Sequence, residues 1–173
     1  MAARFGWAAN TDDRSVEFCV RRWLHGLAVI RAISRSERFD LTLEEQIDLV
    51  DIQRSYAASG GQFWVALDGD VVIGSAAAFN LGDGHVDLRR FFVQKEYRGG
   101  QPSLAQRLLD ETISWAQVNE FKHMYLETAG RYVAARRMYE RNGFREINAS
   151  QLPPTFPVIR VAEHFYYRGI GVS

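Results

Sequence analysis

The stretch YRGGQPSLAQRLL, residues 97–109, carries the residues best suited to ligand chemistry in this sequence. Arg98 holds a permanent positive charge that can grip a phosphate through paired N–H donors. Gly99 and Gly100 let the main chain approach a ligand where a Cβ would obstruct it. Pro102 suits the first turn of a helix, whose leading N–H groups lack internal partners and point outward. The junction therefore predicts a cradle for phosphate or pyrophosphate. The same residues also fit an ordinary strand-to-helix turn with an exposed arginine.

Other phosphate and metal motifs are missing from the sequence. No GK[ST] follows the glycines, as a Walker loop requires, and no GxGxxG occurs. His25, His123 and His164 stand at no metal-ligand spacing. Cys19 is the only cysteine, which excludes an intrachain disulfide and is typical of a reducing compartment. We predict that the protein binds no metal and is cytoplasmic.

Composition and charge narrow the class of protein. The chain has 173 residues, of which 47% are hydrophobic, and this size and composition predict one well-buried domain. Lys plus Arg equals Asp plus Glu at 21 each, so no overall field favours nucleic acid or an anionic membrane. No apolar run is long enough for a signal peptide or a membrane span. Residues 1–14 are polar and aperiodic, so we expect a flexible lead-in before a domain at 15–173.

The elements that must position the junction follow from hydrophobic periodicity. A first strand is expected at 16–22, and two helical patterns follow in 23–60, divided near the polar segment 34–40. Thr42 and Glu45 form a capping box for the second helix. Its apolar stripe includes Ile47, Val50 and Ile52, and Gly60 with Gly61 ends it.

The remaining chain reads as a three-stranded meander followed by alternating helices and strands. Asp68-Gly69-Asp70 joins two apolar runs and predicts a hairpin, and a second turn lies at 81–85. A helix begins at Pro102, and another at Val133 stops at Asn142-Gly143. Strands are expected at 63–67, 71–79, 86–93, 124–127, 144–147 and 158–167. This order predicts an α/β protein with a mixed sheet and helices on its faces.

Four segments in this order resemble the GCN5-related N-acetyltransferases, the GNAT family. They are LRRFFVQKEYRGG, SLAQRLLDETISWAQ, MYLET and AARRMYERNGF, and the likeness covers residues 63–147. The resemblance implies a single GNAT-like domain with a mixed, mostly antiparallel central sheet. It also implies an acetyl-CoA-dependent N-acetyltransferase in which a primary amine attacks the thioester directly, in a ternary complex.

The resemblance supplies a set of cofactor-binding candidates. In the family the junction usually reads Arg/Gln-x-x-Gly-x-Gly/Ala, and its amides hold the pyrophosphate of acetyl-CoA. Here Gln101-Pro102-Ser103 replaces the later glycines, which leaves open which amides of 100–105 point inward. Backbone groups of the preceding strand bind the pantetheine arm in the family, and Arg136 is a candidate for the adenosine 3′-phosphate. The full set is Phe91, Phe92, Val93, Arg98, Gly99, Gly100, Gln101, Ser103, Leu104, Ala105 and Arg136.

The resemblance also implies catalytic roles. Tyr139 matches the tyrosine that commonly protonates the departing sulfur, although a purely packing role would also explain it. Asp87 stands where several members place a catalytic glutamate. Glu127 and His85 are alternative bases, and a solvated strand face would explain any of them. Some members use no dedicated base.

Several features depart from the family or are left open by it. Tyr132 stands where many members have an asparagine that contacts the cofactor. Arg131 could reach the 3′-phosphate, whereas Arg137 and Arg141 fit a solvated basic face better. The acceptor amine stays open, from antibiotics and polyamines to amino acids and proteins, and the family's many dimers allow a homodimer. A catalytically silent acyl-CoA sensor or interaction module of the same fold is the alternative.

Overall fold

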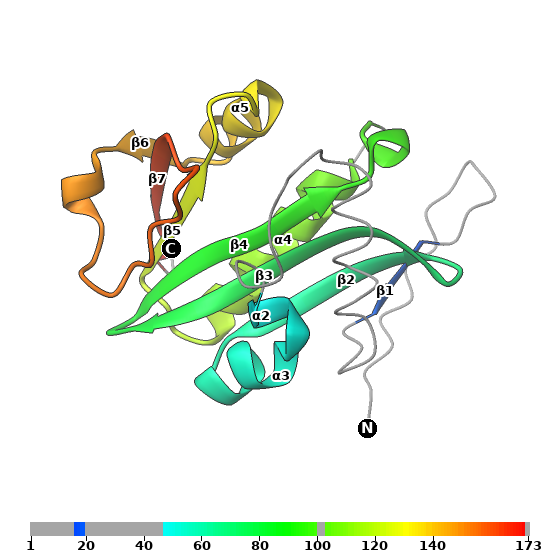
Figure 1. Cartoon of the computed structure of the whole chain (residues 1–173), viewed down its shortest axis with the longest axis horizontal. Helices are drawn as coiled ribbons and strands as arrows, with labels where there is room; N and C mark the ends of the chain where they lie inside the picture. The colour runs from blue at the N-terminus through cyan, green and yellow to red at the C-terminus, as the bar shows by residue number, and fades with distance from the viewer. Residues whose placement is uncertain (1–15, 20–46, 100–102, 172–173) are drawn as a thin grey trace.

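The computed structural model describes residues 16–19, 47–99 and 103–171, the first of these by backbone only. Within these ranges seven strands form one sheet in the order β1-β2-β3-β4-β5-β7-β6 (Figure 1). The strands are β1 Val16–Cys19, β2 Gln62–Asp68, β3 Val71–Gly82, β4 His85–Val93, β5 His123–Thr128, β6 Arg145–Ile147 and β7 His164–Gly169. Among these described strands only β4 and β5 pair in parallel, and the predicted mixed, mostly antiparallel sheet is confirmed.

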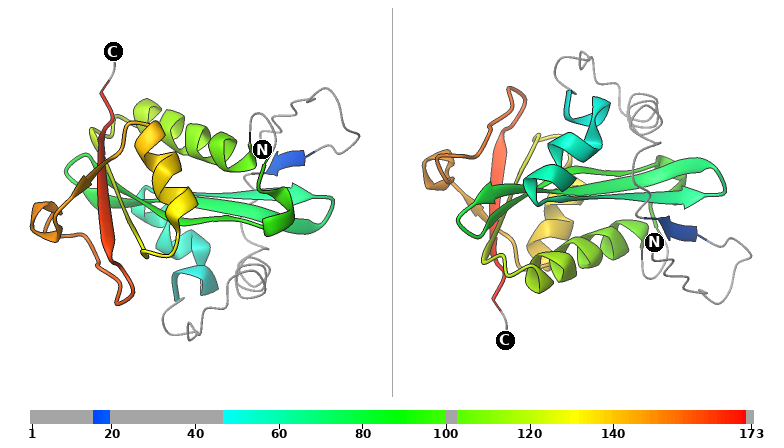
Figure 2. Two further views of the ribbon diagram at one scale, coloured as in Figure 1. Left: turned by 90° about the horizontal axis from the view of Figure 1, so that it is seen from above. Right: turned by 90° about the horizontal axis from the view of Figure 1, so that it is seen from below.

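Helices cover both faces of the sheet. The longer helices, α4 Leu104–Val118 and α5 Val133–Arg141, lie on one face, and α2 Ile47–Val50 with α3 Ile52–Ser55 lies on the other (Figure 2). Because alternate side chains of a strand point to opposite faces, β2 contributes to two cores. Trp64 packs under α4 against Trp115, whereas Phe63 and Val65 pack toward α2 and α3.

The predicted meander of three strands is confirmed. β2 and β3 meet at a turn in which Gly69 has a φ of 57°. β3 runs to Gly82, beyond the expected end at 79, and Asp83 and Gly84 form the next turn with φ of 51° and 74°. Asp and Gly tolerate this left-handed conformation, which explains the sequence of the turn.

The predicted continuous helix before β2 is wrong over the described residues. Residues 47–59 instead form α2, α3 and a 3₁₀ turn, η2 Ala57–Ser59. Asp51 interrupts the helix because its side chain caps α3, accepting from the Arg54 N–H at 3.0 Å. The predicted apolar stripe is wrong at Val50, which is 64% exposed, whereas Ile52 packs against the core that contains Leu49. Gly60 ends the segment as predicted, at a φ of 76°. The first predicted helix and the Thr42–Glu45 capping box lie outside the described residues.

The starts of α4 and β7 also differ from the prediction. α4 begins at Leu104, because Ser103 is its N-cap and accepts the Gln106 N–H at 3.2 Å. β7 begins at His164, not at Val158, and residues 158–163 form a loop. The limits of α5 are those predicted, with Gly143 in the left-handed conformation just after it. The 3₁₀ turns η3 Lys95–Tyr97 and η4 Ala149–Gln151 complete the described elements.

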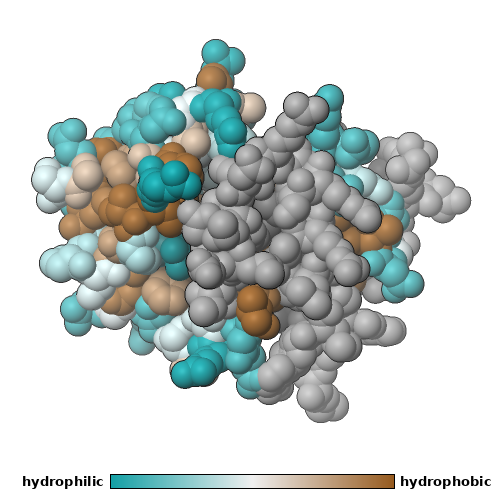
Figure 3. All heavy atoms as spheres, in the orientation of Figure 1, coloured by the Kyte–Doolittle hydropathy of each residue, from teal (hydrophilic) through white to brown (hydrophobic). Residues whose placement is uncertain are grey.

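The surface of the described residues is mixed in character. Seen as in Figure 1, apolar patches on the β5–β7 side are broken up by hydrophilic residues (Figure 3). Val158 and Ile159, in the loop before β7, are 55% and 45% exposed. Among the described residues, no helix has the length and apolar character needed to cross a bilayer.

Candidate active site

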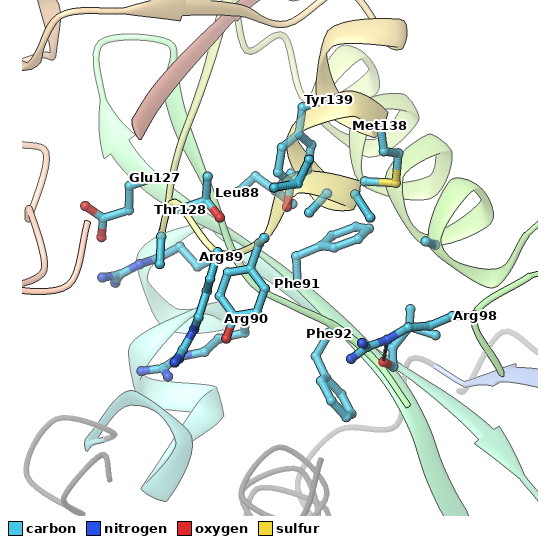
Figure 4. A pocket seen from close by; sticks show the side chains of 18 of the residues that line it. Leu88, Arg89, Arg90, Phe91, Phe92, Arg98, Glu127, Thr128, Met138 and Tyr139 are labelled. Atoms are coloured by element: carbon cyan, nitrogen blue, oxygen red, sulfur yellow. Dashed lines mark hydrogen bonds between the residues drawn. The ribbon is translucent and has the colours of Figure 1, made fainter. Parts of the chain in front are cut away.

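The candidate site lies where β4 and β5 separate. The two strands pair only from His85–His123 to Asp87–Tyr125, and beyond these three pairs both strands line a cavity of about 820 Å³. The start of α4, the side of α5 and the loop at 159–161 complete its walls. Glu127 lies toward one end of the cavity and Arg98 toward the other, with Tyr139 and Met138 reaching in from α5 (Figure 4). The cavity is therefore long and lined from several elements.

The strand-to-helix junction forms the Arg98 end of the cavity. The Arg98 Nε donates to the carbonyl of Val93 at 2.8 Å, which closes the loop on itself (Figure 4). Gly99 has a φ of 148°, a conformation that residues with a Cβ rarely adopt. Ser103 and Ala105 line the cavity, whereas the Leu104 side chain is buried in the core. The predicted residues Gly100 and Gln101 lie outside the described residues.

A bulge bends β4 beside the cavity. Ser75 pairs with Phe92 and Ala77 with Arg89, so Arg90 and Phe91 together stand opposite Ala76. Arg90 has a φ of 50°, and its carbonyl accepts the Ser75 hydroxyl at 2.8 Å. Extra residues of this kind re-aim the side chains that follow them. Phe91, Phe92 and Val93, all predicted cofactor-binding residues, line the cavity.

Asp87 is a buried acid on the cavity wall. Its side chain is 1% exposed, and Oδ2 lies 3.0 Å from the Arg89 Nε. Neither carboxylate oxygen has a hydrogen bond within the described part of the chain. The pKa of Asp87 is raised to about 7, chiefly by burial, with Arg89 opposing the shift and Glu127 adding to it. A carboxyl that titrates near neutrality and lacks hydrogen-bond partners is well placed to exchange a proton with a ligand.

Glu127 is the second acid of the cavity. Its two oxygens accept the backbone N–H of Ile159 at 3.2 and 3.1 Å. Burial raises the pKa of Glu127 to about 7, although that N–H and the Arg89 guanidinium favour its charged form. The bond holds the 159–161 loop over the cavity, and it ties the chain to β5 at Ile159, before β7 begins at His164.

Tyr139 faces the cavity from the buried side of α5. Its ring is edge-on to Phe91 at 6.0 Å between centroids, and it also contacts Phe144 and Tyr166. Burial, followed by the nearby Tyr166, raises the pKa of the Tyr139 phenol above its ordinary value. The phenol therefore stays protonated at neutral pH, as an acid catalyst must. Tyr139 packs in the core, as one sequence interpretation expected, and it also lines the cavity, while its role as an acid stays a prediction.

Comparison with known proteins agrees with this arrangement. Residues 27–144, well over half of the chain, match the model of the Acetyltransferase (GNAT) family. The chain belongs to the GNAT family. The resemblance inferred from the sequence is thereby confirmed, and the expected fold with it.

Curated GNAT relatives are longer than this chain. Human N-acetylaspartate synthetase is 37% identical over 105 residues, which are 60% of this chain and 34% of that protein. The N-acetyltransferase family 8 member 2 of Rattus norvegicus is 30% identical over 106 residues, 58% of this chain and 46% of that protein. The chain thus spans between a third and a half of these two relatives.

Solved GNAT structures match along most of the chain. An acetyltransferase from Staphylococcus aureus Mu50 aligns with a TM-score of 0.84 and 28% identity, covering 90% of this chain and 99% of that one. N-acetylglutamate synthase from Neisseria gonorrhoeae, solved with coenzyme A and N-acetylglutamate, aligns with a TM-score of 0.67. At 13% identity, over 93% of this chain and 36% of that one, the second match shows the GNAT fold alone.

Two residues singled out in the sequence lie away from the cavity of this GNAT domain. His85 stands at the start of β4 and packs against His123, with ring centroids 4.9 Å apart. Arg136 donates to the Tyr166 hydroxyl at 3.1 Å and lies 3.7 Å from Glu146, and it is not part of the cavity wall. These contacts point Arg136 toward β6 and β7, so the structure does not support it as a cofactor-binding residue.

Other cavity residues were missed or undervalued in the sequence. Arg89 contacts Asp87 and was not singled out, because a charged residue on a strand gives no signal by itself. Ile159 and Arg160 lie in what was expected to be a strand. Arg141, interpreted as solvated, lines the cavity together with Arg131 and Tyr132. Ser103 followed by Gln106 three residues later is a capping pattern that could have located the start of α4.

Within 47–99 and 103–171, no group of three or more His, Cys, Asp and Glu side chains is placed to hold a metal.

Proposed function

We propose that this protein is an acetyl-CoA-dependent N-acetyltransferase that acts on a primary amine. The observation that carries the proposal is the cavity between the separated strands, which holds a buried carboxyl with a pKa of about 7 and the protonated phenol of Tyr139. Membership of the GNAT family supports acetyl-CoA as the donor.

The Arg98 end of the cavity suits the donor. The N-terminus of the 15-residue helix α4 favours negative charge, and Arg98 lines the cavity beside it. Gly99, Ser103 and Ala105 would bring the main chain near the pyrophosphate, and Gly100 and Gln101 stay predictions for the same cradle. Phe91 to Val93 would flank the pantetheine arm. Bound acetyl-CoA supplies the activated acyl group.

The other end suits the acceptor and the proton transfers. Asp87, coupled to Glu127, takes a proton from the acceptor ammonium, and the neutral amine attacks the thioester carbonyl. The new C–N bond forms as the C–S bond breaks, Tyr139 gives its proton to the departing sulfur, and the second proton of the attacking nitrogen passes to the Tyr139 phenolate and restores the phenol. This route needs no covalent acetyl-enzyme and no metal.

We further propose that the acceptor carries a carboxylate beside its amine, as an amino acid does. Arg89, Arg131 and Arg160 line this cavity, and guanidinium groups pair well with carboxylates. The names of the N-acetylaspartate synthetases describe an amino acid acceptor, which supports the same class here.

Titration calorimetry with acetyl-CoA, followed by assay of free thiol with a panel of amines, tests the proposed function. We expect saturable acetyl-CoA binding, and thiol release with amino acids above that with polyamines or aminoglycosides. Failure to bind acetyl-CoA would exclude the proposal. Binding without thiol release for every amine would favour the alternative, a catalytically silent acyl-CoA-binding module.

A further inference from the structure

Asp48 on α2 holds Arg90 of β4 from the face of the sheet opposite to Tyr139. The Arg90 Nε donates to Oδ2 of Asp48 at 2.9 Å, and the Arg90 Nη2 donates to Oδ1. The hydroxyl of Tyr56, a fully buried residue, donates to the same Oδ2. Burial opposes the charge on Asp48, yet Arg90 keeps the pKa of this carboxyl below its ordinary value. Bidentate pairing of this kind fixes both the position and the direction of an arginine.

Arg90, which this ion pair holds, has a strained backbone conformation. A φ of 50° is strained for a residue with a Cβ, and it persists only where the surroundings enforce it. Three contacts enforce this conformation of Arg90. Asp48 forms an ion pair with the Arg90 side chain, the Tyr56 hydroxyl donates to Asp48, and the Ser75 hydroxyl donates to the Arg90 carbonyl. Glycine would adopt the same conformation without such contacts.

The bulge also changes which face each residue of β4 occupies. Before it, Val86 and Leu88 pack in the core under α4 and α5. After it, Phe91 and Val93 pack on that side, and Phe92 packs with the core near α2. In a regular strand, residues 86, 88, 90 and 92 would share one face. Because 91 and 93 instead lie on the face of 86 and 88, the alternation of faces along β4 has shifted by one residue. Without the bulge, Phe91 would turn away from Tyr139, because a one-residue slip moves every later side chain to the other face.

We propose that Asp48 and Tyr56 are positioning residues for acetyl transfer, acting through the Arg90 bulge that sets the orientation of residues 91–93 along the cavity. This rests on the function proposed for the cavity. Neither Asp48 nor Tyr56 lines it, so their influence must pass through Arg90. The helix that carries Asp48 thereby becomes part of the machinery that aligns the donor.

Steady-state kinetics of three variants test the proposal. Asp48→Asn weakens the ion pair, and we expect kcat to fall by about tenfold or more while the KM for acetyl-CoA changes by less than about threefold, since small misplacements cost rate. Tyr56→Phe should give a smaller fall in kcat.

In the double variant Asp48→Asn/Arg90→Gly, glycine adopts the bulge without the ion pair and no buried carboxylate is left unpaired. Its kcat should return to within a few fold of the original. A double variant as slow as Asp48→Asn overturns the proposal. Val65→Ala, which loosens the same core without touching the ion pair, controls for lost stability.

Hydrogen exchange of the ligand-free protein gives a readout that does not depend on turnover. Asp48→Asn should speed amide exchange of residues 89–93 by about tenfold, leave the middle of α4 unchanged, and be reversed by Arg90→Gly. Unchanged exchange of 89–93 overturns the positioning role even if kcat falls. If the unmodified protein acetylates no amine, the proposed function fails, and the exchange result still decides whether Asp48 fixes the bulge.

Discussion

Replacing Asp87 with asparagine should make the protein more stable at pH 8 while making it a poorer catalyst. Asp87 is 1% exposed and has a folded-state pKa of about 7, against an ordinary value of 3.8. The folded state therefore binds a proton more tightly than the unfolded chain does. The contribution of the Asp87 carboxyl to the free energy of unfolding is fully present below pH 3.8 and is lost as the pH rises through about 7.

The magnitude follows from that difference. At about 1.4 kcal/mol for each pH unit, the raised pKa of Asp87 lowers the stability of the fold by about 4 kcal/mol at pH 8 and by roughly 1 to 2 kcal/mol at pH 5, relative to low pH. The Asp87→Asn variant has no such cost. The free energy of unfolding of the variant, minus that of the original, should therefore rise by about 3 kcal/mol between pH 5 and pH 8. Titrations of groups that do not interact with Asp87 cancel in this difference.

Urea unfolding followed by tryptophan fluorescence at pH 5, 6, 7 and 8 measures the difference, and equal m-values support the comparison. Asp83→Asn is the matched control, because Asp83 is exposed in a turn where asparagine tolerates the same left-handed backbone. Its stability should follow that of the original protein at every pH. A stability difference for Asp87→Asn that stays constant with pH would refute our explanation. The rate of thiol release by Asp87→Asn should also fall at pH 8, because the substitution that stabilises the fold removes the proposed base.

Three other substitutions test the site and the scaffold. Glu127→Gln removes a charge that raises the pKa of Asp87, so the acid limb of the pH profile of kcat/KM should move below pH 7. Loss of activity at every pH would instead make Glu127 the base. Tyr139→Phe keeps the packing, and kcat for thiol release should drop by about 100-fold with unchanged thermal stability; full turnover would remove its assigned role. Gly61→Ala would place a Cβ 2.3 Å from the Ala78 carbonyl oxygen, so urea unfolding should show a loss of about 2 kcal/mol or more, whereas Gly171→Ala, with open space around it, should be neutral.

The parts of the fold that could be predicted from sequence are those set by local patterns. Asp68-Gly69-Asp70 between apolar runs located the first hairpin, and Asn142-Gly143 located the end of α5. Val158 to Tyr167 was interpreted as a strand because its apolar residues satisfy strand propensity. The bond from Ile159 to Glu127, 32 residues earlier, overrides that propensity, and no local pattern signals it.

The candidate site was predictable only in part, for a similar reason. Asp87, Glu127 and Tyr139 were named from family likeness, and the structure brings all three to one cavity. Their altered pKa values depend on burial and on neighbours that meet only in the folded sheet, as Asp87 of β4 and Glu127 of β5 do. The bulge at Arg90 also escaped the sequence, because arginine is an unusual residue at positive φ and its partner Asp48 lies 42 residues away.

The brief pairing of β4 with β5 also bears on how the chain folds. β2, β3 and β4 are joined by tight turns, so their contacts close short loops, whereas β5 reaches β4 only after the whole 94–122 segment. Non-local pairing of this kind has a larger loop-closure cost and forms late. We expect the meander to assemble first and the cavity last. Acetyl-CoA added during refolding should then leave the folding rate nearly unchanged and slow unfolding, because it recognises contacts absent from the transition state.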